Sequence, residues 1–431
     1  MNTRRSLLRA APAAFAAAAL APWASLSVSQ AAGPGSNRFV FVILRGGMDG
    51  LTAVPAVGDP AFAGARGVLG QFASEPLHLN ATFALHPLLP QLHTMFGQGE
   101  LTVLHAVGLP YRERSHFDAQ QVLESGGQRP YELTSGWLGR ALTASAAGVS
   151  ARPLQAVALQ TAVPLVLRGH EGVDTWAPST QAEPGADLVS RLQIMYRDDS
   201  ALAQALARAR ALRAEPGMAA NPQAQTDLGT AGPGAVPGAV PGAIPGAVPG
   251  AIPGAGGRNA AVLLARKAAE FLQRGSQVAV MELGGWDSHT NQGAPAGALS
   301  NNLRTLDATL AALREALLPG GTWSRTVVLV ATEFGREVVV NGNQGTDHGT
   351  GGAAFVLGGA VKGGRVLSDW PGLASKDRFE GRDLRVTTDL RAVIRPLLAD
   401  HLRVPRAALD ALVLPGSAGL ASLDLLRGTA A

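Results

Sequence analysis

Apolar runs of strand length that end in short polar turns are the most regular pattern in this 431-residue sequence. Segment 37–44 (NRFVFVIL) leads into Arg-Gly-Gly-Met-Asp, and segments 277–283 and 326–331 lead into turns of similar character. Continuous apolar runs without alternation are typical of strands that are buried on both faces, as in parallel sheets. Shorter runs that we also expect to form strands are 101–107, 154–159, 164–167 and 354–357.

Segments with helical patterning separate these runs. The expected helices are 186–214, 258–273, 299–318 and 388–402. One of them carries leucines at helical spacing, and this apolar stripe consists of Leu303, Leu306, Leu310 and Leu313. Such a stripe indicates a helix packed on a sheet. Strands that alternate with helices predict an α/β fold with a large, mostly parallel central sheet flanked by helices, in which functional side chains gather beyond the strand ends.

The N-terminus has the pattern of an export signal. Arg4 and Arg5 precede an alanine-rich apolar stretch, and small residues follow at Ser29-Gln30-Ala31. This pattern predicts a twin-arginine signal peptide at 1–31, a periplasmic or otherwise exported protein, and the twin-arginine machinery as a partner. The alternative is a short membrane anchor, which the short apolar stretch disfavours. The mature chain offers no later run of transmembrane length.

A Pro-Gly-Ala-Val/Ile repeat occupies 232–257. Proline and glycine fill half of its positions, so neither a helix nor a central strand can persist there. We therefore expect a flexible surface insertion within a single domain that spans 37–431.

Charge and cysteine content exclude two classes of protein. The formal net charge is +4, and the expected signal peptide contributes Arg4, Arg5 and Arg9 to it, which leaves +1 for the mature chain. No basic cluster with interleaved aromatic residues is present, so nucleic acid is not an expected partner. The chain has no cysteine, which excludes a disulfide framework.

Acidic and imidazole side chains lie in the turns after the apolar runs. Asp287 and His289 are two positions apart, so both side chains project to the same side of an extended loop. Glu333 ends a strongly apolar run, where a carboxylate is costly unless it is paired or metal-bound. Mixed Asp and His ligands suit zinc, manganese or iron better than calcium. The candidate metal ligands are Asp49, Asp287, His289, Glu333, Asp347 and His348.

Ser115 is the candidate nucleophile. It lies in YRERSHFD, after an expected strand and at the expected start of a helix. Backbone N–H groups and the positive end of the helix dipole favour an alkoxide and a bound anion there. The alternative is an ordinary N-cap, with Asp118 completing a capping box. His116 is a possible ligand, proton donor or structural residue.

Several blocks of the sequence resemble those of one family. The segments LRGGMDGL, RSHFDAQ, GGWDSHTNQ, ATEFGRE and GTDHGTGGAAFVLGG, followed by VTTDLRAVI, are similar in content and order to the family known as domain of unknown function 1501. They cover nearly the whole mature chain. The resemblance implies twin-arginine export and an alkaline phosphatase-like fold, shared with sulfatases and cofactor-independent phosphoglycerate mutases.

The resemblance also implies a two-metal site. Carried over residue by residue, Asp49 and Ser115 belong to one metal. The second metal takes Asp287, His289 and His348. One departure is that a single residue separates Asp287 from His289, where the superfamily usually has three.

A second departure concerns Glu333, which takes the place of the Asp in an Asp-His pair. Phe334 follows it where the superfamily has histidine, so one metal loses an imidazole unless His116 or Asp347 replaces it. An oxygen-rich site of this kind favours magnesium or manganese.

Together these features predict an exported hydrolase of small anionic phosphate or sulfate esters, with divalent zinc, manganese or magnesium as cofactor. Two metals would clamp the attacking and leaving oxygens. Arginines in the motif blocks hold the remaining oxygens in bidentate fashion or form structural salt bridges, and these are Arg45, Arg114 and Arg336. The alternative, suggested by Phe334, is a non-catalytic exported binding or assembly protein that retains the fold.

Overall fold

The computed structural model describes residues 36–146, 156–178, 185–213 and 257–428. The expected signal peptide at 1–31 lies outside the described residues, as does the repeat at 232–257 except for its last residue. In the part of the chain that is described, no helix combines the length and the apolar character needed to cross a membrane.

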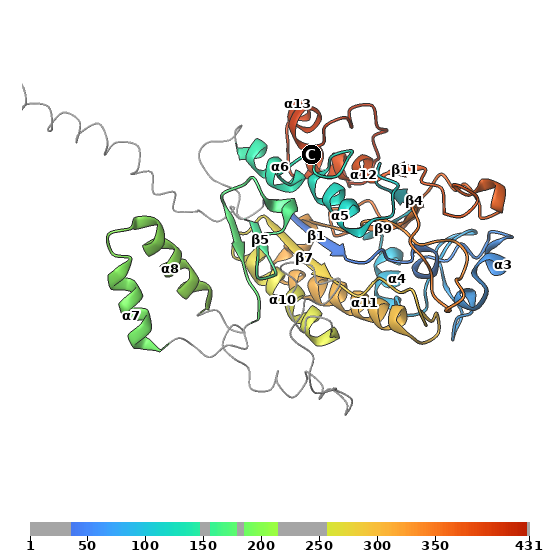
Figure 1. Cartoon of the computed structure of the whole chain (residues 1–431), viewed down its shortest axis with the longest axis horizontal. Helices are drawn as coiled ribbons and strands as arrows, with labels where there is room; N and C mark the ends of the chain where they lie inside the picture. Colours follow the sequence, from blue (N-terminus) through green and yellow to red (C-terminus); the bar gives the residue numbers. More distant parts are fainter. Residues whose placement is uncertain (1–35, 147–155, 179–184, 214–256, 429–431) are drawn as a thin grey trace, which may run out of the picture.

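A nine-stranded sheet forms the centre of the molecule (Figure 1). Its strand order is β10-β4-β9-β8-β1-β7-β5-β6, and β11 pairs with β4. Among these strands β9 alone runs antiparallel to its neighbours, so the expected large, mostly parallel sheet is confirmed. The strands are β1 (Arg38–Leu44), β4 (Leu101–Gly108), β5 (Ala156–Ala158), β6 (Val173–Thr175), β7 (Val278–Leu283), β8 (Thr326–Thr332), β9 (Gly352–Leu357), β10 (Arg365–Leu367) and β11 (Thr388–Asp389). A separate two-stranded sheet pairs β2 (Leu77–His78) with β3 (Ala84–Leu85).

Strand β1 shows why its residues are continuously apolar. All seven are buried, and from Phe39 onwards successive side chains enter different cores. Val40 and Val42 belong to one core, whereas Phe39 and Phe41 belong to the core on the opposite face of the sheet. Both faces are covered from Phe39 to Leu44, which explains the apolar run there. Arg38, at the start of the strand, donates to the Leu272 carbonyl oxygen instead.

Two layers of helices cover the sheet (Figure 1). One face carries α4 (Pro90–Gly97), α10 (Arg258–Gln273) and α11 (Ala298–Leu317), and the apolar leucine stripe of α11 is buried there as expected. The other face carries α5 (His116–Ser125), α6 (Trp137–Ala146) and α12 (Leu390–Pro396). The remaining described α-helices are α2 (Gly50–Ala53), α3 (Phe62–Arg66), α7 (Ala186–Met195), α8 (Ser200–Arg213) and α13 (Arg406–Ala408).

Three expected elements differ from the structure. Segment 164–167 is a single 3-10 turn at Leu165–Leu167 rather than a strand, because the Leu167 N–H bonds back to the Pro164 carbonyl at 3.1 Å. The expected helix 186–214 is interrupted between α7 and α8, where Asp199 accepts a hydrogen bond from the Leu202 N–H and so begins a new helix. Segment 388–402 starts as β11 and becomes helical only at α12.

Candidate metal centre

Three histidines from distant parts of the chain meet at the edge of the sheet where β1, β7 and β8 end. His116 is the first residue of α5, His289 follows β7, and His348 lies between β8 and β9. The ring centroids of His116 and His348 are 4.3 Å apart, and those of His289 and His348 are 4.7 Å apart. These three residues and Asp287 are called the histidine cluster below.

One carboxylate oxygen, Oδ1 of Asp287, lies at the centre of the cluster. The Nε2 atoms of His289, His348 and His116 lie 2.9, 3.2 and 3.4 Å from it. The Nε2 atoms of His289 and His348 are also only 2.9 Å from each other. The ligand atoms of His116, Asp287 and His348 all lie within 4.8 Å of one another, and Nε2 of His289 lies beside two of them.

The opposite nitrogen of each ring contacts a hydrogen-bond acceptor. Nδ1 of His116 lies 2.9 Å from Oε1 of Glu333, and Nδ1 of His289 lies 2.9 Å from Oδ1 of Asp347. Nδ1 of His348 lies 2.9 Å from the backbone carbonyl oxygen of Arg114. Because each acceptor requires a proton on Nδ1, the neutral form of each ring presents a bare Nε2 lone pair to the cluster.

This arrangement fits a bound metal ion. Histidine ligands of metals commonly donate their outer N–H to a carboxylate or a backbone carbonyl, as these three do. Nε2 of His116 is buried and has no well-formed hydrogen bond to satisfy it. Neighbouring Nε2 lone pairs repel one another when both rings are neutral, and a bound cation, like a proton, removes that repulsion.

The charges around the cluster favour a cation as well. Burial alone would raise the pKa of Asp287, but the adjacent imidazoles of His116 and His348 and the guanidinium of Arg336 hold it well below its usual range. The pKa of Glu333 falls to about 2 in spite of burial, because His116 donates to it. Burial lowers the pKa of His116, yet the carboxylates of Asp287 and Glu333 outweigh this and raise it to about 9. The carboxylates that favour a proton at this position also favour a metal.

Phe334 forms an apolar wall of the cluster. Its ring centroid lies 4.7 Å from that of His116 and 4.9 Å from that of His348. On its other side the ring reaches Gly47, where an added Cβ would lie 2.6 Å from the Phe334 Cε2 atom. An imidazole does lie beside this position, but it belongs to His116, which is far from Phe334 in the sequence.

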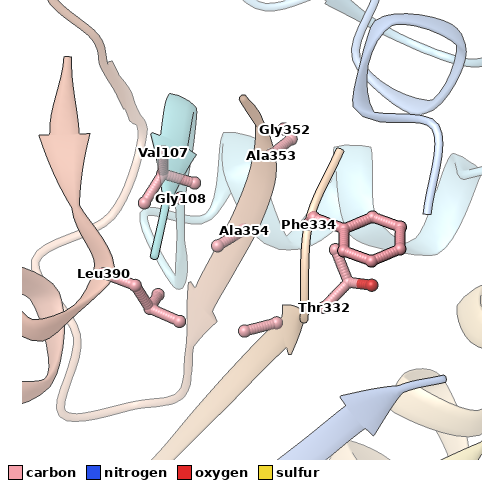
Figure 2. A pocket seen from close by; sticks show the side chains of 9 residues that line it. Val107, Gly108, Thr332, Phe334, Gly352, Ala353, Ala354 and Leu390 are labelled. Carbon is pink, nitrogen blue, oxygen red and sulfur yellow. The ribbon is translucent and has the colours of Figure 1, made fainter. Parts of the chain in front are cut away.

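A small void lies beside Phe334, between β4, β8 and β9 (Figure 2). Apart from backbone atoms, Thr332 is the only lining residue with a polar side chain, and its hydroxyl already bonds to the Leu44 carbonyl at 2.8 Å. The void is therefore an apolar packing gap and not a substrate site.

Comparison with known families assigns the chain. The family described as "Protein of unknown function (DUF1501)" matches residues 96–412, which include all four residues of the histidine cluster. The chain belongs to the DUF1501 family. No curated protein matches the chain significantly.

Several solved structures are similar to this DUF1501 protein. The PsFucS1 sulfatase from Pseudoalteromonas sp. is 13% identical, with 86% of this chain and 70% of that chain covered at a TM-score of 0.40. The phosphonate monoester hydrolase of Agrobacterium radiobacter is 11% identical, with 85% and 74% covered at a TM-score of 0.40. A protein in the alkaline phosphatase superfamily from Vibrio parahaemolyticus is 12% identical, with 77% and 62% covered at a TM-score of 0.33.

Asp49 has a structural position in this DUF1501 chain. Its Oδ1 accepts hydrogen bonds from the Leu51 and Thr52 N–H groups and so caps α2. Its Oδ2 pairs with Arg66 and accepts a 2.5 Å hydrogen bond from the Gln292 side chain. None of its contacts is to the histidine cluster. The sequence pattern predicted Asp49 as a metal ligand. It did not indicate the contacts with Arg66 and Gln292, because no local motif marks them.

Glu333 and Asp347 also differ from the expected role of direct ligands. Each contacts the outer nitrogen of a cluster histidine and so fixes the orientation of that ring. Oε1 of Glu333 further accepts hydrogen bonds from the Gly46 N–H at 2.9 Å and the Gln120 side chain at 3.1 Å. The sequence correctly indicated that this buried carboxylate needs partners, but not which atoms supply them.

The three candidate substrate-binding arginines all form ion pairs with carboxylates of the protein, although Nη1 of Arg45 is buried without a hydrogen bond. Arg336 is fully buried and donates to several backbone carbonyls in addition to its carboxylate partner. The shortest ion pairs of the three measure 2.6 Å, and the carboxylate partners are Glu124 and Glu282 for Arg45, Glu380 and Asp383 for Arg114, and Asp287 for Arg336. The geometry therefore gives each of them the structural salt-bridge role.

Ser115 occupies the N-cap position of α5, but its hydroxyl does not cap the helix. The hydroxyl donates to the Tyr111 phenol, which in turn donates to Oδ2 of Asp118 at 3.0 Å. Because Asp118 binds Tyr111, the alternative capping box does not form. Ser115 lies between Arg114 and His116, the two residues of this segment that touch the cluster.

Proposed function

We propose that this chain is an exported, metal-dependent hydrolase of phosphate or sulfate esters. The observation that carries the proposal is the convergence of three Nε2 atoms on Oδ1 of Asp287, with every outer nitrogen held by an acceptor. The motif blocks that resemble the alkaline phosphatase superfamily support ester hydrolysis as the reaction class. Export is supported by the twin-arginine pattern at Arg4 and Arg5.

The proposed ligands are His116, His348 and Asp287, whose ligand atoms all lie within 4.8 Å of one another and would hold one divalent cation with a position left open for substrate. Nε2 of His289 lies beside this set, 2.9 Å from both Asp287 Oδ1 and His348 Nε2. Two imidazole nitrogens and one oxygen favour zinc or manganese over magnesium, because imidazole binds magnesium poorly. The second metal implied by the family resemblance has no equivalent ligand set in our proposal, since Asp49 is paired with Arg66. We therefore expect one cation per chain.

The chain's own residues prepare the site. When bound, the cation would supply Lewis-acid polarisation of an ester oxygen. Arg336 fixes Asp287 through a 2.6 Å ion pair, and Phe334 excludes water from one side of the rings. Ser115, adjacent to His116, is the proposed nucleophile. As its oxygen bonds to phosphorus or sulfur, the ester bond to the alcohol breaks, and the hydroxyl proton passes through Tyr111 to Asp118. The departing alkoxide takes a proton from water, and a second water then hydrolyses the covalent intermediate and restores the serine.

Elemental analysis of the purified protein, with turnover of aryl phosphate and aryl sulfate, tests the proposal. We expect about one zinc or manganese per chain, as a single site with three protein ligands requires. His348→Ala should lose the metal and the turnover, whereas His78→Ala, at an exposed position distant from the cluster in sequence, should keep both. Metal-free wild-type protein that takes up none of zinc, manganese or magnesium would refute the proposal.

A specific observation favours the second candidate, a non-catalytic exported binding protein. All three arginines expected to hold a substrate anion are paired with carboxylates. Ser115→Ala separates the two functions, because the hydroxyl is not a proposed ligand. Metal content should stay unchanged in this variant. Loss of turnover supports the hydrolase, and wild-type protein that binds metal but turns over neither ester supports the binding protein.

Cell fractionation tests the export. Lysine at both Arg4 and Arg5 should retain the protein in the cytoplasm, because the twin-arginine machinery reads the arginine pair. Periplasmic protein in this double variant would contradict the proposed route.

A further inference from the structure

Arg114 has an unusual backbone conformation that serves the histidine cluster. Its φ is +59°, in the left-handed region that costs energy for a residue with a side chain. In this conformation its carbonyl oxygen lies 2.9 Å from Nδ1 of His348. The other two cluster histidines are oriented by carboxylates, so His348 is the one whose ring orientation depends on a backbone atom.

The side chain of Arg114 is anchored to a turn from the C-terminal part of the chain. Its Nε donates to Oδ2 of Asp383 at 2.7 Å, and its Nη2 donates to Oε2 of Glu380 at 2.6 Å. The Asp383 side chain is completely buried, whereas that of Glu380 is 58% exposed. An exposed ion pair contributes little, so Asp383 is the effective anchor.

The same turn also holds the main chain of His348. Nη2 of Arg382 donates to the His348 carbonyl oxygen at 2.9 Å, and Nη1 of Arg382 lies 3.3 Å from Oδ1 of Asp383. The two oxygens of Asp383 thus each face a different arginine, by a hydrogen bond from Arg114 at Oδ2 and by charge alone from Arg382 at Oδ1. Arg382 also donates to Oε2 of Glu337 at 2.8 Å. One arginine orients the ring of His348, and the other orients its backbone.

We infer that Asp383 is a positioning residue for the metal site, which sets the orientation of His348 through Arg114 and Arg382. The inference rests on the proposed metal centre. Nothing in the sequence around Asp383 indicates such a role, since 34 residues and β9 separate Asp383 from His348. The carboxylate touches neither the cluster nor a substrate, so its effect must appear in how the metal is held.

Metal affinity is the direct measure. We compare Asp383→Asn with Glu380→Gln, which removes the charge of the exposed partner of the same arginine. Loss of a group that orients a metal ligand typically weakens metal binding by about 10- to 100-fold. We expect a loss of this size for Asp383→Asn when its metal affinity is measured by competition with a chelator. Glu380→Gln should change it by less than about threefold, because its ion pair is exposed. The absorption spectrum of the cobalt(II)-loaded protein should shift for Asp383→Asn alone.

A second variant tests the same inference in case Asp383→Asn does not fold. Arg114→Gly removes the anchored side chain but lets the backbone reach φ +59° without strain, so the fold is expected to persist. It should weaken metal binding and shift the cobalt spectrum. Unchanged affinity and spectrum in Arg114→Gly, or in folded Asp383→Asn, overturn the inference while the metal centre stands. A wild-type chain that binds no metal overturns both.

Discussion

Two kinds of histidine in this molecule are distinguished by the ring nitrogen that the protein occupies. His86, His105 and His401 are buried, and in each the Nε2 atom bonds to a backbone carbonyl. In the cluster histidines the acceptor is at Nδ1 instead, and Nε2 faces the other ligands. Nε2 is therefore hydrogen-bonded to the backbone in the three structural histidines, but it is available for chemistry in the cluster histidines.

The first kind predicts a loss of stability in acid. Burial lowers the pKa of His86, His105 and His401 to about 4, from an ordinary value of 6.5. Between these values the unfolded chain binds more protons, so the stabilisation is complete above pH 6.5 and is lost as the pH falls towards 4. Urea unfolding at a series of pH values should show a slope of at most about 4 kcal/mol per pH unit from these three groups.

His105→Gln provides the check on that slope. The variant removes one of the three titrating rings, so its unfolding free energy should depend less steeply on pH between 6.5 and 4. An unchanged slope in His105→Gln would show that other groups cause the acid sensitivity.

The contacts of Asp49 predict that its substitution lowers stability and leaves metal binding unchanged, whereas substitution of a metal ligand would lower metal binding. Asp49→Asn leaves the fully buried guanidinium of Arg66 without its counter-charge, which costs about 3–5 kcal/mol of unfolding free energy. Its metal content should equal that of wild type, because its oxygens bond to Arg66, Thr52 and Gln292. Unfolding in urea and elemental analysis measure the two effects. A variant that loses metal but keeps its stability would restore Asp49 as a ligand.

At the scale of elements, the sequence predicted β1, β7 and β8 to within a residue or two, because strands buried on both faces are continuously apolar. It also predicted that the turns after them would meet. It did not predict which atoms would face inward. The chain between Arg336 and His348 folds back on itself as an isolated bridge, and this long-range pairing places Asp347 outside the cluster and His348 inside it.

The close approach of these two segments predicts that a methyl group added at Gly335 lowers both stability and metal content. A Cβ at Gly335 would lie 1.8 Å from the Gly351 carbonyl oxygen, so Gly335→Ala must push the two segments apart and displace His348. We expect a loss of more than about 4 kcal/mol of stability together with the metal. Gly284→Ala is the matched control, because no atom lies within 4 Å of a Cβ there although Gly284 begins the turn to Asp287. Equal metal content in the two variants would contradict this account.

The histidine cluster joins residues from several distant parts of the chain. Its ligands come from the start of α5, from the turn after β7 and from the segment before β9, so a bound cation links both halves of the chain. The helical pair α7 and α8, by contrast, projects away from the sheet and its covering helices (Figure 1), and no residue of α7 is buried. A cation should therefore stabilise the sheet and the helices on it.

Metal removal should lower the melting temperature. A ligand at 100 times its Kd stabilises the folded state by about 2.7 kcal/mol, which corresponds to a shift of about 3–8 °C for a large domain. Thermal melts with and without EDTA measure the shift. His348→Ala should melt at the same temperature in both conditions, and a persistent EDTA effect in this variant would place the cation elsewhere.

The reversed direction of β9 has a consequence for how the protein can diversify. Since β9 runs against β8, the chain stays at the ligand edge between the two strands and needs no crossover over the sheet, which a parallel neighbour would require. Residues 338–346 at the tip of that hairpin connection carry none of the proposed ligands. We expect the length of this loop to vary among relatives. Changes in this one loop would alter the environment of the metal site and leave the ligands in place.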